Sequence, residues 1–170
     1  MATMHIDEIK AIAQRAHNDA AVRDALFQAL HGENRDAAVH SAWALTHLPK
    51  TDNGFIAAHR EELVGLATTT GDTSLRRIVL TLLERLEWSV PTGREEPPDY
   101  YVELLNFSME HLMMPAEPYG VRSLCMKLAY TLSTPYPELL DELRQCLLMI
   151  EPTELGAGVR HTRNKLLAQL

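Results

Sequence analysis

Four stretches of the chain repeat one pattern of apolar and polar positions. Each stretch has an arginine as its second residue, continues with apolar residues at helical spacing and ends on leucine. The stretches cover residues 34–48, 75–86, 121–132 and 159–170. Their arginines follow one another at intervals of 41, 46 and 38 residues. A helical unit that repeats about every 40 residues is typical of helical-hairpin solenoids, so we expect one repeating helical unit.

Turn and capping residues divide the chain into about nine predicted helices. Asn18 or Asp19 is suited to cap the second helix, and Thr134, followed by Pro135 at the first helical position, is suited to cap the eighth. Strict period-two alternation is missing, so we expect no strand. The predicted helices cover residues 5–17, 20–30, 35–48, 55–69, 74–88, 99–113 and 119–133, with one more after 134–135 and a last one from about 158 to 170.

The short connections between these helices imply antiparallel neighbours. We therefore predict an all-α fold, a short α-α superhelix (solenoid) of about four antiparallel hairpins with an N-terminal capping helix. The prediction is one domain over residues 1–170. Its expected units are 20–49, 52–88, 99–133 and 135–170, with the capping helix at 5–17. The long connection at 89–98 is either a spacer or a loop that contacts a partner.

The four repeated arginines and the apolar positions that follow them resemble those of HEAT-like, or armadillo-type, helical repeats (the ARM-type fold). The apolar sets are Ala38/Ala42/Leu45, Val79/Leu83/Leu86 and Cys125/Ala129/Leu132, and residues 37–45 resemble the alanine-rich inner helix of such a repeat. The last unit departs from the pattern, because Arg163 stands where the other units have Ala38, Val79 and Cys125. The resemblance covers residues 20–170. It implies a scaffold, adaptor or inhibitor, the usual roles in this family, of which a minority are enzymes.

The repeated arginines have two interpretations. In the structural one, each guanidinium bridges the turn between helices to a carboxylate or carbonyl of the neighbouring repeat and ties the stack together. In the functional one they form a ladder that binds anions, but nearby carboxylates would compete for the same charge. We favour the structural interpretation for Arg35, Arg76, Arg122 and Arg160.

A polar and aromatic stripe lies opposite the predicted core of the helix at 35–48. At about 100° per residue, Asp36, His40, Trp43 and His47 share this side. Trp with flanking His is typical of binding hot spots, although Trp43 packing on the adjacent repeat is the plainer interpretation. Alignment on the arginines extends the stripe to Arg77, Glu84, Trp88, Lys127, Tyr130 and Lys165.

The net charge of −7 opposes general nucleic-acid binding, which requires a basic face. No apolar run is long enough to span a membrane, and the first residues do not resemble a secretory signal, so we expect a cytoplasmic protein. Two cysteines are too few for a disulfide framework, and Cys125 and Cys146 fall at apolar positions where thiols are usually inert. Met109, Met113 and Met114 are interpreted as core, or else as an adaptable partner surface.

Motifs for catalysis or cofactor binding are missing. The sequence has no His-Glu-x-x-His, Cys-x-x-Cys, Gly-x-Ser-x-Gly or Walker-type motif. Asp36 and His40 could reach one ion, but His47 lies about 10 Å from His40 along the helix, too far to share it. We therefore predict no catalytic residue, no metal and no cofactor.

The predicted function is a non-catalytic scaffold or adaptor that binds a protein or peptide on the concave face of the repeats. The alternative is a small-molecule binder or enzyme that uses the stripe at Asp36, His40, Trp43 and His47. The last helix ends on apolar Leu166, Leu167 and Leu170, so we also consider a homodimer.

Overall fold

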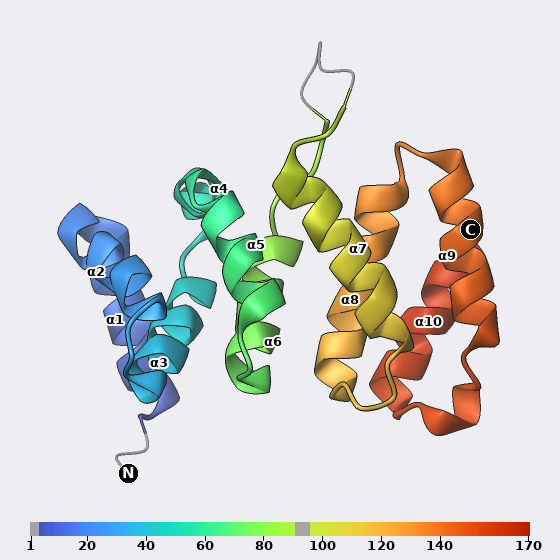
Figure 1. Ribbon diagram of the computed structural model, residues 1–170. Coiled ribbons are helices and arrows are strands. Elements are labelled where there is room, and N and C mark those ends of the chain that lie inside the picture. Colours follow the sequence, from blue (N-terminus) through green and yellow to red (C-terminus); the bar gives the residue numbers. More distant parts are fainter. Residues whose placement is uncertain (1–3, 91–95) are drawn as a thin grey trace. The chain divides into compact units, whose positions relative to one another are not determined.

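The computed structural model describes residues 4–90 and 96–170, and every regular element in these ranges is helical. Ten α-helices and two short 3-10 helices are present in this part of the chain. The prediction of an all-α helical-repeat fold is therefore confirmed. The contacts divide the chain into two compact units, Met1–Leu86 and Glu87–Leu170, each of which is described by itself (Figure 1).

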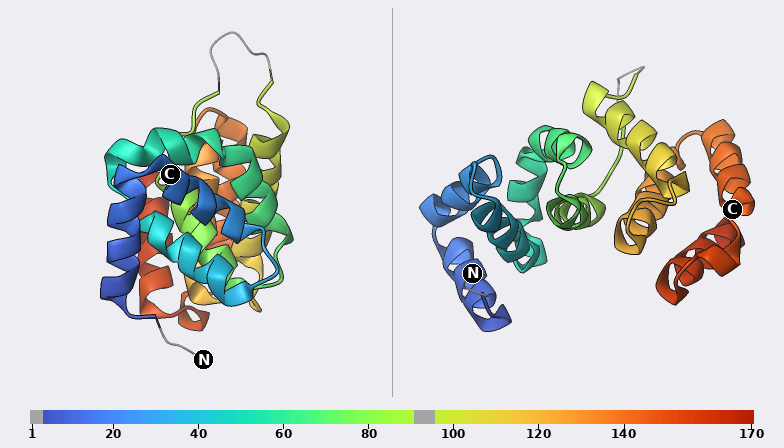
Figure 2. Two further views of the ribbon diagram at one scale, coloured as in Figure 1. Left: turned by 90° about the vertical axis from the view of Figure 1, so that its left-hand side faces the viewer. Right: turned by 60° about the horizontal axis from the view of Figure 1, so that its bottom comes forward.

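In the first unit, successive helices form two stacked hairpins preceded by one helix. Helix α2 packs against α3, α5 packs against α6, and the two hairpins meet where α3 contacts α6. Helix α1 covers the other side of α2 and α3 (Figures 1 and 2). The elements are α1 (Ile6–Asn18), α2 (Ala20–Leu30), α3 (Arg35–Thr46), the 3-10 helix η1 (Lys50–Asp52), α4 (Asn53–Ala58), α5 (Arg60–Thr69) and α6 (Thr73–Glu84).

Side-chain caps begin three of these helices. The Asp19 carboxylate accepts from the N–H of Ala21, and the Asn34 amide oxygen accepts from the N–H of Ala37. Asp72 Oδ1 accepts two bonds at the start of α6. Such caps satisfy N–H groups that have no partner inside the helix, which is why these helices begin close to their predicted positions.

Two predicted helices in the first unit differ from the observed ones. The helix predicted at 55–69 breaks at His59, whose ring stacks on Phe27 with the centroids 3.9 Å apart. Apolar residues continue in phase through this break, so periodicity alone did not reveal it. The helix predicted to reach Trp88 ends at Glu84, and the side chain of the following Arg85 donates to carbonyls of the α3–η1 connection.

The second unit is built around α8. This helix packs against α7, α9 and α10, and most of its apolar residues are buried (Figure 1). Helix α10 rests mainly on α8 and touches α9 only slightly, so the last hairpin is less closed than the others. The elements are α7 (Asp99–Met113), α8 (Tyr119–Ser133), α9 (Pro137–Met149), the 3-10 helix η2 (Pro152–Glu154) and α10 (Ala157–Gln169).

The limits predicted for α7 and α8 agree with the structure, but the cap predicted for the next helix is wrong. Helix α9 begins at Pro137 with Tyr136 at the N-cap, not at Thr134–Pro135. The Thr134 hydroxyl instead donates to the carbonyl of Tyr130 and so completes the end of α8. Both prolines suit a first helical position, and tertiary packing selects the second.

Candidate functional site

An arginine at the fourth position of a helix recurs in both units. It is Arg23 in α2, Arg76 in α6, Arg122 in α8 and Arg160 in α10. Each donates to carbonyl groups of the segment just before its helix, namely at Ala16 and His17, at Ala67 and Thr70, at Leu112, and at Pro152 and Leu155. A cation beside carbonyl groups at a helix end is favourable, because those groups lack partners within the helix.

Arg35 does not belong to this set, although the sequence pattern groups it there. It is the first residue of α3, and the fourth is Ala38. Its guanidinium pairs with the Asp72 carboxylate at the start of α6, so it joins two hairpins rather than closing one. The alignment on arginines is therefore displaced by three residues in α3, and sequence reasoning missed Arg23, which follows the capping Asp19 by four residues as Arg76 follows Asp72.

Asp72 thus serves two elements at once. Burial alone would raise the pKa of its carboxyl. The bond from the Leu75 N–H and the nearby Arg35 guanidinium outweigh that effect, so the pKa of Asp72 lies below its usual value. The carboxylate form is therefore the one that holds this junction.

Arg163, the departure in the last unit, is a buried cation. Its side chain is 7% exposed, and Nε donates to the carbonyl of Leu147 in α9 at 2.7 Å. Asn164 accepts a further bond from Nη1. Arg163 therefore joins α10 to α9 across the hairpin that has the fewest helix contacts.

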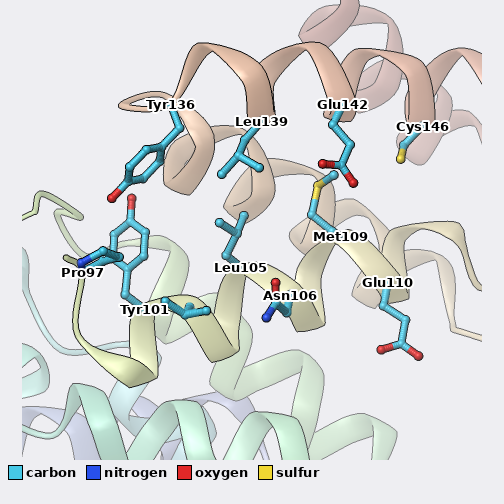
Figure 3. A pocket seen from close by; sticks show the side chains of 11 residues that line it. Pro97, Tyr101, Leu105, Asn106, Met109, Glu110, Tyr136, Leu139, Glu142 and Cys146 are labelled. Carbon is cyan, nitrogen blue, oxygen red and sulfur yellow. The ribbon is translucent and has the colours of Figure 1, made fainter.

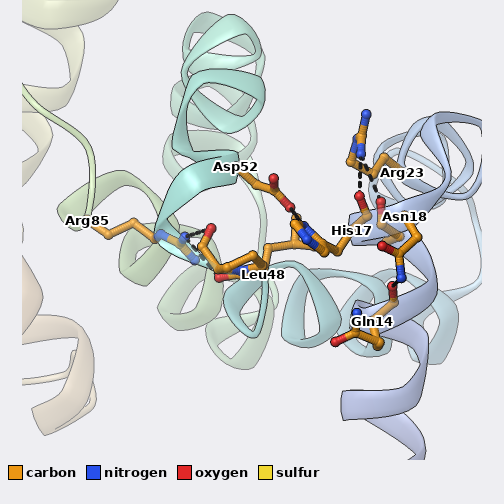
Figure 4. A network of polar contacts seen from close by, with 9 residues as sticks. Gln14, His17, Asn18, Arg23, Leu48, Asp52 and Arg85 are labelled. Carbon is orange, nitrogen blue, oxygen red and sulfur yellow. Dashed lines mark hydrogen bonds and ion pairs between the residues drawn. The ribbon is translucent and has the colours of Figure 1, made fainter.

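Arg85 forms a second contact that the sequence pattern did not reveal. Its guanidinium donates to the carbonyl of Leu48 (Figure 4) and to that of Pro49. It also donates to the Asn53 side chain. Nearby, the Asp52 carboxylate lies 3.0 Å from His17 Nδ1, which connects η1 to α1. Together these polar contacts fix the connection between the two hairpins of the first unit.

In the first unit, the predicted stripe on α3 divides between a pocket and an open surface. Asp36 and His40 line a pocket of about 510 Å³ between α1 and α3, together with apolar Ile12 of α1 and Leu26 of α2. Trp43 is half-buried, and its ring lies 6.4 Å from that of the exposed His47. Arg77 and Glu84 of α6 are exposed.

In the second unit, the predicted residues are spread over three elements. The Trp88 ring packs edge-on against the Tyr101 ring, with the ring centroids 6.0 Å apart, so Trp88 packs against the start of α7. Tyr130 of α8 is half-buried. Lys127 and Lys165 are exposed. The pocket between α7 and α9 and the one at the starts of α8 and α10 are lined by other residues.

A groove between α7 and α9 is the feature that the sequence did not predict (Figure 3). It has a volume of about 560 Å³ and is lined by apolar side chains that include Val102, Met109 and Leu139. Glu110 and Glu142 lie at its far end, opposite Tyr101 and Tyr136 (Figure 3). The sequence offered one signal, the interpretation of the α7 methionines as an adaptable surface.

A buried hydrogen bond anchors Tyr101 at one end of this groove. The Tyr101 hydroxyl donates to the Leu132 carbonyl of α8 at 2.6 Å. Burial, and to a smaller extent Tyr136, raises the pKa of Tyr101 to about 12. Burial, followed by the Glu142 carboxylate, also raises the pKa of the Cys146 thiol, which therefore remains neutral near pH 7.

Two further features were sought in the described ranges, a cluster of metal-binding side chains and a membrane-spanning helix. Within residues 4–90 and 96–170, no group of three or more His, Cys, Asp or Glu side chains is placed to hold a metal ion. No helix in the same ranges is long and apolar enough to cross a membrane. Half of the loop predicted at 89–98, residues 91–95, lies outside the described residues.

The whole chain, residues 1–170, matches the profile of the HEAT repeat domain. The protein belongs to the HEAT repeat family, which confirms the resemblance seen in the sequence. Membership of this family indicates a protein-interaction scaffold in general terms. Searches of curated proteins and of solved structures gave no significant match.

Proposed function

We propose that this protein is a non-catalytic scaffold or adaptor that binds a protein or peptide segment on the face of its second helices. In helical-repeat proteins this is the concave face. In the first unit the surface would be centred on His40, Trp43 and His47. In the second unit, Tyr130 would be its aromatic residue, with Lys127 and Lys165 supplying positive charge.

One observation carries the proposal, the pocket between α1 and α3. Two polar residues of the stripe, Asp36 and His40, line it beside apolar Ile12. Further along α3, Trp43 keeps part of its ring exposed beside His47. A half-buried Trp one helical turn beyond a pocket lined by both polar and apolar side chains is suited to anchor a peptide. Helices that are already packed also lose little entropy on binding.

A small-molecule ligand is the second candidate, and the same pocket favours it. Its volume of about 510 Å³ falls within the range of about 300–1,000 Å³ typical of small-molecule sites. Asp36 and His40 would then orient the ligand. Thermal unfolding with a panel of small molecules separates the two candidates, because a ligand bound to the native state raises Tm.

The homodimer considered from the sequence has less apolar surface available than expected. Leu166 is buried, and Leu167 and Leu170 are half-buried. A monomer in light scattering would remove this proposal, whereas a dimer lost on changing Leu167 to Lys would support it.

The test is an affinity pull-down from the native cell extract with the wild type, Trp43→Ala, Tyr130→Ala and the double variant. Leu148→Ala is the matched control. Leu148 is exposed on α9, which is the first helix of its hairpin, and it lies away from the stripe. Circular dichroism verifies that each variant keeps its helices. A discrete partner that binds the wild type and the control but not the double variant supports the proposal. A partner that all variants retain contradicts it.

A further inference from the structure

The residues that line the groove between α7 and α9 are regularly spaced on both helices, and most of them are apolar or aromatic. Val102, Leu105 and Met109 follow one another at i, i+3 and i+7 on α7, and Leu139, Glu142 and Cys146 do so on α9. Each wall is therefore a straight helical stripe about 10 Å long. Figure 3 shows the two stripes facing each other, with Leu105 opposite Leu139.

The stripe on α9 continues beyond the groove. Met149 lies three residues after Cys146, on the same side of the helix, and is 74% exposed. Val102 on the opposite wall is 40% exposed. Exposed apolar side chains such as Val102 and Met149 favour association with another apolar surface, and methionines adapt to its shape.

The charge around the groove is strongly acidic. Helices α7 and α9 together carry six carboxylates and a single guanidinium, that of Arg144. The carboxylates are Asp99, Glu103, Glu110, Glu138, Asp141 and Glu142. Two of them, Glu110 and Glu142, line the groove itself. An occupant with positive charge beside an apolar face would match this surface, whereas an acidic one would be repelled.

We propose that the α7–α9 groove binds a basic amphipathic helix of a partner protein. About two turns of helix match the length of the walls, and the continuation of α9 to Met149 makes room for about a third. Apolar residues of the partner at i, i+3, i+4 and i+7 contact Val102, Met109 and Leu139, the helix-in-groove mode of recognition. Its Lys and Arg side chains lie against Glu110 and Glu142. This surface is formed by first helices of the second unit, so it is separate from the surface proposed above.

The probe for this proposal is a fluorescein-labelled synthetic peptide of about 12 residues. It has Leu or Met at the four apolar positions and Lys or Arg elsewhere, and its binding to the full chain is measured by fluorescence anisotropy. The control peptide keeps the apolar positions and replaces every basic residue by Glu. We expect the basic peptide to bind and the acidic one not to, with an affinity that falls as the salt concentration rises.

Two pairs of variants locate the peptide. Met109→Lys introduces a charge into the groove, and we expect it to weaken binding at least about tenfold. Leu148→Lys, on the opposite side of α9, should leave the affinity unchanged. Glu142→Lys should weaken binding about threefold to tenfold, whereas the same change at the neighbouring Asp141, which faces away from the groove, should have a smaller effect.

Alkylation of Cys146 by iodoacetamide gives an independent readout of the position. Cys125 is fully buried, so modification at Cys146 reports on the groove. Saturating basic peptide should slow this modification, as followed by mass spectrometry, and the acidic peptide should not.

Several results would overturn the proposal. The first is equal binding of the basic and the acidic peptide, and the second is an unchanged peptide affinity in Met109→Lys. The third is a self-association of the protein that Met109→Lys abolishes, because a second copy of the chain would then be the occupant of the groove. Trp43→Ala should leave the peptide affinity unchanged. If Trp43→Ala weakens the peptide, the probe binds the first unit and the groove is not its site. Since the pull-down depends on Trp43 and Tyr130, it can succeed or fail independently of this test.

Discussion

The pocket in the first unit and the groove in the second have similar volumes, about 510 and 560 Å³, but different chemical character. The pocket lies between α1 and α3, which is the second helix of its hairpin, and Asp36 and His40 line it. The groove lies between two first helices, α7 and α9, and its centre is apolar. The two units therefore leave a cavity beside different helices, because different helices pack most closely in each unit.

The contacts that hold the two surfaces also differ. In the second unit, Tyr101 at the groove and Arg122 of α8 donate to carbonyls from buried positions. Beside the pocket, the junction of α3 and α6 is held by Arg35 and Asp72, which keep more contact with water. Polar bonds formed in a buried environment leave an unsatisfied group when one partner is removed. Substitutions in the second unit should therefore be more destabilising than their counterparts in the first.

The largest effect is expected for Arg122→Met. Arg122 is 4% exposed, and its loss leaves the Leu112 carbonyl without this donor and the site incompletely packed. We expect the free energy of unfolding to fall by about 2–4 kcal/mol, measured by urea denaturation. Arg160 is the fourth residue of α10, as Arg122 is of α8, but its side chain is exposed. Arg160→Met should therefore have a clearly smaller effect. Equal losses would show that burial does not distinguish the two arginines.

Tyr101→Phe should cost about 1–2 kcal/mol, because it removes only the hydroxyl bond to Leu132. The pKa of Tyr101 is raised to about 12 from an ordinary value of 10.0. The unfolded chain therefore loses this proton at a lower pH than the native one. The stabilisation is complete below pH 10 and is lost as the pH rises toward 12. Urea denaturation between pH 9 and 11.5 should show a steeper decline in the wild type than in Tyr101→Phe.

In the first unit, Asp72→Ala should cost about 1–2 kcal/mol through loss of the cap of α6. Asp72→Asn should cost less, because Asn34 shows that an amide oxygen caps a helix here. Since the pKa of Asp72 is lowered from 3.8, the carboxylate contributes stability above that pH, and the contribution is lost as the pH falls through the native value. Acid titration of thermal stability should reveal this loss in the wild type and not in Asp72→Asn. An identical acid response in both would contradict the role of the carboxylate.

The smallest effect is expected at the groove thiol. Glu142→Gln removes a carboxylate that helps to raise the pKa of Cys146. Alkylation of Cys146 at pH 7.5 should become about twofold to fourfold faster. Asp141→Gln is the matched control, since Asp141 lies on the other side of α9. A rate that stays the same in Glu142→Gln would show that burial alone sets the reactivity of this thiol.

The helices themselves were largely predictable, because their signals are local. Capping residues such as Asp19 and Asp72 lie next to the helices that they begin, and the limits of α2, α7 and α8 agree with the predicted ones. Where two local signals competed, prediction was wrong. Thr134–Pro135 and Tyr136–Pro137 both suited the start of α9, and only packing selected between them.

The repeated arginine was recognised in the sequence, but its register in α3 was not. A spacing of 41 residues fits the pattern as well as one of 38, since a shift of three residues keeps the same side of a helix. The structure places Arg35 at the start of α3 and Arg76 one turn into α6, where they make different contacts. The extension of the stripe from Asp36 to Arg77 rests on that register and remains a prediction.

The sequence by itself determined the helical-repeat class, the capped helix starts and the absence of known catalytic motifs, because these depend on residues close together in the chain. Only the tertiary structure decided which apolar residues stay covered. Val102 and Met109 have the spacing of core residues, yet they line an open groove because α10 rests on α8 and α9 stands apart from α7. Whether an apolar stripe is buried depends on the distance to the next helix, which is set by contacts far away in the sequence.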